Sequence, residues 1–234
     1  MNSAPSQRWR CCDCKAGFRL RSRSAVTAIH MAWNGRSKQG MSRDRESLVD
    51  WLEADLCYGS GRNEAICFSE AWRATMDDDR AKLLEIAELA AAFRGTSEFA
   101  LESSQQGAAC LATLCRVWPD RLLDWLSEIL RERRVQPALA VVLGVASARQ
   151  GIQVSLALPA FLQSYIANLV TAGVRLIPLG QTDGQLAIAE LEEAVRAAST
   201  QAEKSTIDDL GSAAFMVDLA SMAHETQYTR LFRS

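Results

Sequence analysis

The sequence predicts an all-α protein, a single helical-bundle domain of about nine helices. Hydrophobic residues make up 48% of the 234-residue chain but aromatic residues only 7%, and Ala and Leu, which favour helices, are abundant. Val and Ile are scattered and do not alternate with polar residues as they would in strands. From residue 44 onward, helix start and stop signals follow one another in regular order. No linker is long enough to divide this region into two domains.

Nine segments carry these helical signals. They are residues 44–61, 63–75, 77–95, 97–118, 119–134, 136–151, 155–177, 182–199 and 206–225.

The first three segments begin or end on familiar helix signals. The first carries one apolar stripe and ends at Gly59 and Gly61, which are good terminators. Asn63 is a candidate N-cap for the second. The third starts with the acids 77–79, which suit the positive end of the helix dipole, and stops at Gly95. The same acids could bind a cation, but capping explains them.

The next three segments form the middle of the bundle. Ser97 caps the fourth and Pro119 ends it, while its small centre, residues 107–109, predicts close approach by another helix, within the bundle or across a dimer. The fifth ends in cations, as the dipole prefers. The sixth has Pro137 at a first-turn position and is apolar nearly all round, which predicts a central, fully buried helix.

The seventh segment predicts a helix of about six turns, with Pro159 in or near its first turn, where a missing N–H costs little. It ends in the joint RLIPLGQTDGQ. Arg175 places a cation in the last turn, Pro178 blocks continuation and Gly180 supplies the turn. The eighth and ninth segments complete the set.

The joint has two interpretations, a ligand loop or a helix connection. A phosphate loop needs a Lys after its second glycine and a strand before the first, and neither is present. Thr182 and Gln185 instead predict a capping box, in which the Thr hydroxyl accepts from the third helical N–H and the Gln reaches back to the cap. Arg175, Gln181, Asp183 and Gln185 are polar beyond the needs of a turn. Together with Thr182, they are expected to brace the two helices or to meet a partner.

The charge of the chain changes sign near residue 43. Residues 1–43 hold nine Lys or Arg and one acid, Asp13, a net of +8. The remainder holds 17 Lys or Arg and 27 acids, a net of −10. The acidic charge of residues 44–234 argues against a nucleic-acid role for this part of the chain.

The basic N-terminal segment, residues 1–43, has three interpretations. Cys11, Cys12 and Cys14 could belong to a zinc-bound nucleic-acid protein, but the chain has no second C-x-x-C to complete four ligands. The segment could be an Arg- and Ser-rich targeting peptide. The default interpretation is a disordered tail, because basic blocks with few apolar residues rarely fold.

No segment is expected to cross a membrane or direct secretion. The longest apolar region, 156–179, is interrupted by Gln163, Asn168 and Arg175, and no apolar signal region follows Met1. The chain is therefore expected to be cytoplasmic, with its seven Cys as reduced thiols.

Catalytic candidates are few. His224 and Glu225 could form the acid–base pair of a small helical enzyme, although a lone His near an acid is more often structural. A nucleophilic Cys needs a base to activate it, and the sequence does not place one beside Cys110 or Cys115.

The C-terminal tail has the composition of a binding segment. Aromatic and Arg residues interleave there, as in protein-interface hot spots. The alternative is a tail folded back onto its own core. The candidate binding residues are His224, Glu225, Thr226, Gln227, Tyr228, Arg230, Leu231, Phe232 and Arg233.

Three stretches resemble the family of the urease accessory protein UreF. They are LVDWLEADLCYGSGRNEAICFSEAWRA (48–74), ANLVTAGVRLIPLGQTDGQ (167–185) and DDLGSAAFMVDLASMAHETQYTRLFRS (208–234). The resemblance covers about residues 44–234, and the joint and the tail are its most specific parts.

The resemblance implies an all-α protein that is not an enzyme but a chaperone of nickel insertion. Family members dimerise, bind the scaffold protein UreD (also called UreH) and recruit the GTPase UreG, which delivers nickel into apo-urease. The tail of the family becomes ordered on the UreD-type partner, which maps here onto residues 224–234. Nickel and GTP would be handled by the partners, so no cofactor of the chain's own is expected.

The chain departs from the family pattern before residue 43. The family has an N-terminal block with S-x-x-F-P-x-G-x-F and S-x-G-L-E, whereas residues 21–40 read RSRSAVTAIHMAWNGRSKQG. We hypothesise that residues 1 to about 42 come from a shifted reading frame or a misassigned start. Translating the other frames of the upstream DNA tests this, and absence of the family block from every frame would refute it.

Overall fold

The computed structural model describes residues 44–93, 97–176 and 179–211. Within these ranges the chain forms α-helices and one short 3-10 helix, η1, and no strand, so the all-α prediction is confirmed. The helices are α2 (Arg45–Tyr58), α3 (Ser60–Met76), α4 (Arg80–Ala92), α5 (Ser97–Val117), α6 (Arg121–Arg133), α7 (Leu139–Arg149), α8 (Val154–Leu176), α9 (Gln181–Glu190), α10 (Glu192–Ala202) and η1 (Ile207–Asp209).

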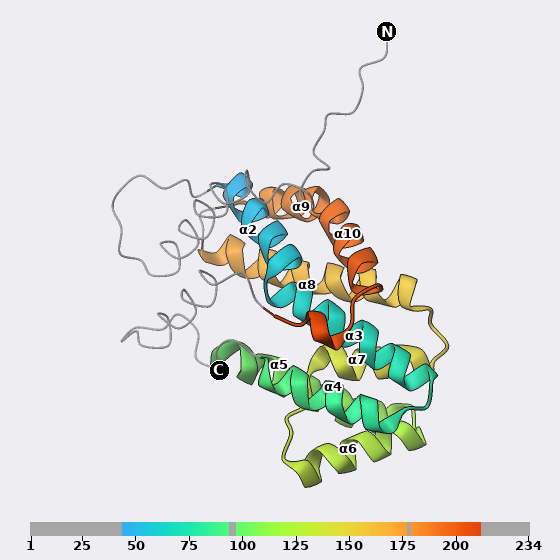
Figure 1. Ribbon diagram of the computed structural model, residues 1–234. Helices are drawn as coiled ribbons and strands as arrows, with labels where there is room; N and C mark the ends of the chain where they lie inside the picture. Colours follow the sequence, from blue (N-terminus) through green and yellow to red (C-terminus); the bar gives the residue numbers. More distant parts are fainter. Residues whose placement is uncertain (1–43, 94–96, 177–178, 212–234) are drawn as a thin grey trace.

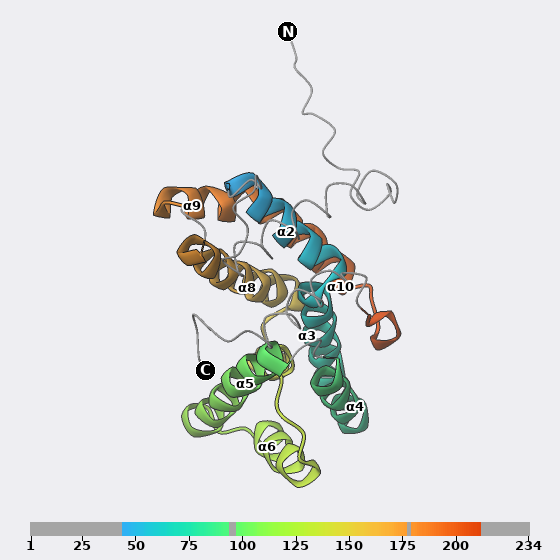
Figure 2. The same cartoon turned by 90° about the vertical axis from the view of Figure 1, so that its left-hand side faces the viewer.

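The helices are arranged around α3, α7 and α8. Figures 1 and 2 show α2, α9 and α10 at one end of the molecule and α4, α5 and α6 at the other. The core extends through both ends of the molecule, and its largest fully buried side chains come from five helices, α2, α3, α4, α6 and α8. They include Leu52, Phe68, Ile86, Leu123, Leu162 and Ile166.

The α2–α3 junction corrects one prediction. Helix α3 begins at Ser60, so Asn63 lies inside it and is not its N-cap. Asp55 of α2 does the capping instead, because its carboxylate accepts the backbone N–H groups of Ser60 at 3.0 Å and Gly61 at 3.1 Å. The same carboxylate accepts the Tyr165 hydroxyl of α8 at 2.8 Å. Asp55, a buried acid on the apolar stripe of α2, thus accepts hydrogen bonds from backbone N–H groups at the start of α3 that have no partner within that helix.

Helices α4 and α6 both begin on aspartates, which the sequence predicts for α4. Asp79 accepts the Lys82 N–H at 2.9 Å, and Asp120 accepts the N–H groups of Leu122 and Leu123. The capping interpretation of Asp79 is therefore confirmed. The predicted stop of α4 at Gly95 lies outside the described residues.

Asp120 also joins α6 to α7, and this contact predicts a pH dependence. Burial alone would raise the pKa of Asp120, but hydrogen bonds from Arg149 and from the two backbone N–H groups, with the Arg149 charge, hold that pKa below its ordinary 3.8. Arg149 lies 2.7 Å from the carboxylate. Because the pKa of Asp120 is lower in the folded state than in the unfolded state, its ionised carboxylate stabilises the fold at pH values above the unfolded-state pKa. This stabilisation is lost as the pH falls through the folded-state pKa.

Asp120→Asn is therefore expected to cost about 1 kcal/mol or less at pH 7, because Asn caps helices about as well as Asp. Its free energy of unfolding should approach that of the wild type as the pH falls below about 4. Chemical denaturation at pH 7 and pH 3 measures this, with Asp208→Asn at an exposed carboxylate as the control. A difference that stays constant between the two pH values would contradict the assignment.

Helix α7 is central and mostly buried, as its composition predicts, but it is not fully buried, because Leu139, Leu143 and Ser147 are half-buried and Arg149 is exposed. Seven of its eleven residues are buried. Pro137, however, precedes the first turn, because α7 begins at Leu139 after Ala138. Gly107 of α5 lies against the Pro137 carbonyl, where a side chain would clash, so the small centre of α5 admits the segment that leads into α7. Ala108 and Ala109 are exposed, and their predicted role in a dimer stays untested.

Helix α8 is long and its Pro159 is its sixth residue, in the second turn and not the first. By length and composition alone, Val154–Thr171 could cross a membrane, with a mean hydropathy of 1.3. In this fold Leu158, Leu162 and Ile166 pack into the core and are fully buried. The opposite side of α8 is exposed and carries Ser164 and Asn168, which fits a helix of a bundle.

The predicted helix over 182–199 is two helices, α9 and α10, that meet at Leu191. Ala187, Leu191 and Val195 are all buried at a spacing of four residues, so the apolar pattern continues through the bend and could not reveal it. The prediction of a helix over 206–225 is wrong for its first residues, which form the 3-10 helix η1 followed by non-helical residues at 210 and 211. The rest of that segment lies outside the described residues.

Candidate partner-binding surface

The joint between α8 and α9 is closed by Gly180 and Asp183. Gly180 takes the cap position in an extended conformation, and its N–H donates to the Asp183 carboxylate at 3.1 Å. Thr182 lies inside α9, which begins at Gln181. The predicted capping box of Thr182 and Gln185 is therefore wrong: the helix starts two residues earlier, and an acid in its first turn reaches back to the cap.

The joint is braced against α2. Arg45, the first residue of α2, lies 3.2 Å from the Glu190 carboxylate and 4.0 Å from that of Asp183. Gly184 lets α9 approach α8 closely, since a β-carbon there would lie 3.0 Å from Val174. Asp183 thus has a structural role, holding both the helix start and a contact with a helix far away in the chain.

The remaining joint residues face solvent. Gln181, Thr182 and Gln185 are exposed, and so is the neighbouring Leu186 at 44%. Arg175 lies in the last turn of α8, and its side chain is outside the described part. Within the joint, Asp183 therefore has a structural role, whereas Gln181, Thr182 and Gln185 face solvent. Their predicted contact with a partner stays a prediction.

The candidate binding residues 224–234 lie outside the described residues, but the chain leading to them is held by α3. Glu70 and Arg73 form an ion pair at 2.6 Å on one side of that helix. Arg73 donates to the carbonyl oxygens of Glu203, at 2.8 Å, and Ser205. Glu70 accepts the backbone N–H of Ile207 at 3.2 Å. The Glu70–Arg73 pair is therefore hydrogen-bonded to three backbone groups just after α10.

Two further α3 side chains continue this series toward the start of the helix. Arg62 donates to the Asp209 carbonyl at 2.5 Å, and Asn63 accepts the Gly211 N–H at 3.2 Å. We call Arg62, Asn63, Glu70 and Arg73 the α3 clamp. Because of it, the backbone of 203–211 runs along α3 and reaches Asn63 at its last described residue. The sequence offered one signal for the clamp, the Glu70–Arg73 pair at i, i+3.

The clamp predicts that Arg73→Met frees the backbone of 203–211. Hydrogen bonds from a charged donor contribute about 1.5–3 kcal/mol each, and the partial exposure of Arg73 places them at the lower end. We expect amide hydrogen exchange at Ser205 and Ile207 to accelerate by about tenfold or more, with α7 unchanged. Arg196→Met, which removes the exposed pair with Glu193, is the control. Equal exchange in the two variants would contradict the clamp.

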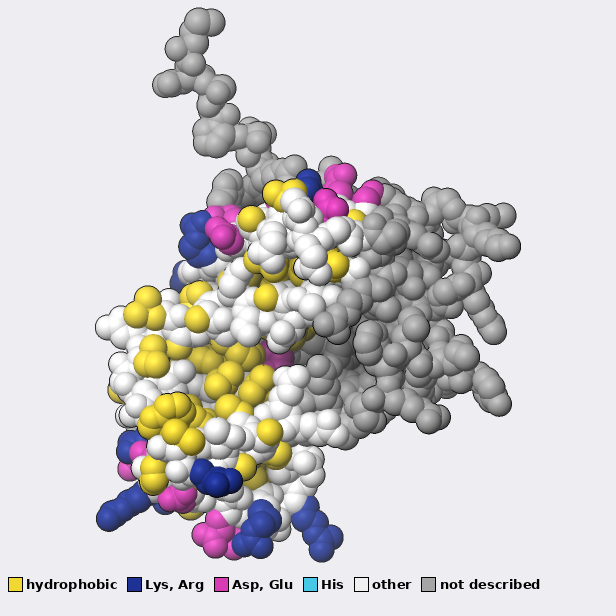
Figure 3. Space-filling view, turned by 180° about the vertical axis from the view of Figure 1, so that it is seen from behind, with side chains coloured by type: hydrophobic (Ala, Val, Ile, Leu, Met, Phe, Trp, Pro, Cys, Tyr) yellow, Lys and Arg dark blue, Asp and Glu magenta, His cyan; other side chains and the backbone are white. Residues whose placement is uncertain are grey.

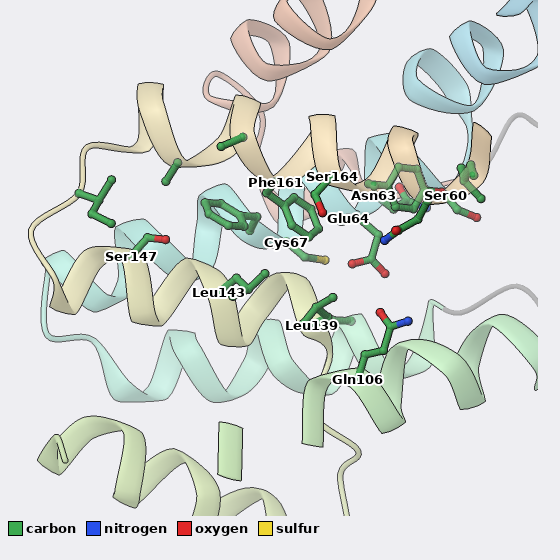
Figure 4. Close-up of a pocket in the computed structure, with 18 of the residues that line it drawn as sticks. Ser60, Asn63, Glu64, Cys67, Gln106, Leu139, Leu143, Ser147, Phe161 and Ser164 are labelled. Atoms are coloured by element: carbon green, nitrogen blue, oxygen red, sulfur yellow. The ribbon is translucent and has the colours of Figure 1, made fainter. Parts of the chain in front are cut away.

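An apolar groove opens beside the clamp. It encloses about 520 Å³ between α3, α4, α5, α7 and α8, and Figure 3 shows the hydrophobic side chains gathered on this face. Phe68 and Phe161 stack at its base with ring centroids 5.1 Å apart. In Figure 4, Leu143 of α7 and Phe161 of α8 point into the same space, and Asn63 lies at one end. Nothing in the sequence pattern predicted this groove.

The groove is bordered by large apolar side chains in contact with solvent. Phe93 is 46% exposed, Ile152 45% and Leu156 67%. Exposed apolar side chains that gather around a groove mark a surface that another segment or molecule covers.

The catalytic candidates gain no support from the described residues. Burial raises the pKa of Cys110, and burial together with the charge of Asp124 and a hydrogen bond to it raises that of Cys115. Raised pKa values keep both thiols protonated near neutral pH, whereas a nucleophile must be a thiolate. In the described ranges, no three His, Cys, Asp or Glu residues gather as a metal site would require. His224, Glu225 and the cysteines of residues 11–14 lie outside those ranges.

Comparison with known proteins identifies the relatives of the chain. A family model described as UreF matches residues 42–192. A protein named urease accessory protein UreF from Rhodopseudomonas palustris is 44% identical over 191 residues, 82% of this chain and 77% of the relative. Proteins of the same name from Bradyrhizobium diazoefficiens (44% over 191 residues, 82% and 78%) and Granulibacter bethesdensis (43% over 197 residues, 84% and 82%) are equally similar.

The family match includes the α8–α9 joint and begins near the point where the charge of the chain changes sign. Residues 1–41 lie outside it. The mis-framed N-terminus remains a hypothesis.

Proposed function

Because the chain belongs to the UreF family of urease accessory proteins, we propose that it is a non-catalytic adaptor in urease maturation. It binds the UreD/UreH-type scaffold protein and recruits the UreG-type GTPase, so that nickel is inserted into apo-urease. The observation that carries this proposal is the family match itself, at 40–46% identity to the curated relatives.

The binding surface of the proposed adaptor is the C-terminal tail, residues 224–234. Its Tyr, Phe and Arg side chains suit a protein interface, and the α3 clamp fixes the point from which the chain departs toward it. The exposed Gln181, Thr182 and Gln185 offer a second polar surface. An acidic body of net −10 is suited to a protein partner and would be repelled by nucleic acid.

In this role, the partner proteins bind the nickel and the GTP. The chain acts in the cytoplasm as a homodimer, and it needs no cofactor of its own, because the GTPase binds GTP and carries the nickel.

A pull-down tests the proposal. The tagged chain is co-expressed with UreD/UreH-type and UreG-type proteins, with and without its first 42 residues. We expect the scaffold protein to be retained directly and the GTPase to be retained when the scaffold is present. Since residues 1–41 lie outside the family match, the shortened chain should retain both equally well. Failure of both forms to retain the scaffold protein would refute the adaptor role.

A further inference from the structure

We infer that the hydroxyl of Tyr165 links the apolar groove to the backbone of residues 209–211, so that withdrawing this hydroxyl from Asp55 loosens that backbone. The inference rests on the Asp55 carboxylate, which is hydrogen-bonded both to the groove and to the start of α3. It concerns the isolated chain, and it depends neither on the proposed partners nor on what occupies the groove.

Tyr165 belongs both to the groove and to the α2–α3 junction. Its side chain is half-buried and lines the groove, and its hydroxyl donates to Asp55 Oδ2 at 2.8 Å. The same oxygen accepts the backbone N–H of Gly61 at 3.1 Å, and the other carboxylate oxygen accepts that of Ser60 at 3.0 Å. Because hydrogen bonds that share one carboxylate support one another, the Tyr165 hydroxyl helps to fix the first turn of α3.

The junction is packed tightly around this carboxylate. A β-carbon at Gly59 would lie 2.5 Å from Asp55 Oδ1. A β-carbon at Gly61 would lie 2.8 Å from Asp55 Oδ2 and 3.1 Å from the ring of Tyr165. Since groups packed this closely cannot shift independently of one another, a displacement of Tyr165 is transmitted to the backbone at the start of α3.

The first turn of α3 carries the two side chains that hold residues 209–211. Arg62 donates to the Asp209 carbonyl at 2.5 Å, and Asn63 accepts the Gly211 N–H at 3.2 Å. In Figure 4, Asn63 lies at one end of the groove. The Tyr165 hydroxyl therefore acts on the backbone of 209–211 through the turn that positions these two side chains.

The other half of the α3 clamp should not respond to Tyr165. Glu70 and Arg73 lie about two turns further along α3, and they hold backbone groups between residues 203 and 207. Neither side chain belongs to the first turn that Asp55 fixes. The two halves of the clamp can therefore be distinguished by experiment.

Amide hydrogen exchange of the full chain, measured residue by residue, tests the inference. Tyr165→Phe removes the hydroxyl and keeps the ring in the groove. We expect exchange at Gly211 to accelerate by about fivefold, the effect of losing one hydrogen bond, whereas exchange at Ser205 and Ile207 should stay within about twofold. Ser164→Ala removes the hydroxyl of an exposed residue that lines the same groove, and it should change none of the three rates.

A double variant shows whether the link passes through the start of α3. Asn63→Ala removes the acceptor of the Gly211 N–H, so exchange there should already be fast. Adding Tyr165→Phe to Asn63→Ala should accelerate it by less than about twofold, because both changes remove the same restraint. Equal acceleration at Gly211, Ser205 and Ile207 in Tyr165→Phe would show a general loss of stability and overturn the inference. Unchanged exchange at Gly211, or additive effects in the double variant, would also overturn it.

Discussion

Removing residues 224–234 is expected to abolish retention of the UreD/UreH-type scaffold protein. The tail holds Tyr228, Leu231 and Phe232 beside Arg230 and Arg233, and such aromatic and Arg residues contribute most of the binding energy in protein interfaces. Loss of two or three hot spots of about 2 kcal/mol each weakens binding by about a thousandfold or more. Surface-immobilised chain and purified scaffold protein give the affinity directly.

Two control variants show whether the sequence of the tail or its mere presence matters. A tail of the same eleven residues in scrambled order should bind no better than the deletion. Phe232→Ala alone should lower the affinity by about thirtyfold, since one hot spot corresponds to about 2 kcal/mol. An undiminished affinity after the deletion would show that the binding residues lie elsewhere, and the exposed face of the α8–α9 joint would be examined next.

The second large effect concerns the stability of the fold. Asp55 is 2% exposed and accepts the N–H groups of Ser60 and Gly61 and the hydroxyl of Tyr165. Asp55→Ala leaves these donors unpaired at the junction of α2, α3 and α8. Each unpaired buried donor costs about 1–3 kcal/mol, so the free energy of unfolding should fall by about 3 kcal/mol. In thermal unfolding this corresponds to a Tm lower by about 6–12 °C.

Tyr165→Phe is the matched control for Asp55→Ala. It removes one hydrogen bond of the same carboxylate and leaves both backbone contacts in place, so it should cost about 1 kcal/mol. If Asp55→Ala proved no more damaging than Tyr165→Phe, the carboxylate would not be the group that holds the junction.

The sequence predicted those parts of the fold whose signals are local. Helix α4 is the clearest case, because Asp79, one of the acids that the sequence assigns to its start, caps it from within the same short segment. The buried character of α7 followed from its composition alone. The α9–α10 bend did not follow, since buried residues keep a helical spacing through Leu191 and periodicity carries no information on a change of axis.

The candidate site was harder to predict because its contacts join distant parts of the chain. Asp183 was recognised as polar beyond the needs of a turn, but its bracing role depends on Arg45. The α3 clamp depends on pairs such as Arg73 with Glu203, which no local pattern encodes. Gly180 could not be distinguished from Thr182 as the cap, because both residue types serve at helix starts. The tail itself was singled out by composition and by resemblance, and its contacts stay a prediction.

The nickel content of urease tests the central claim most directly. Urease is produced together with its other accessory proteins in cells that contain or lack this chain, purified under identical conditions and analysed for metal. The adaptor role predicts urease with its full complement of nickel when the chain is present and largely apo-urease when it is absent. Equal nickel content in the two preparations would contradict the account.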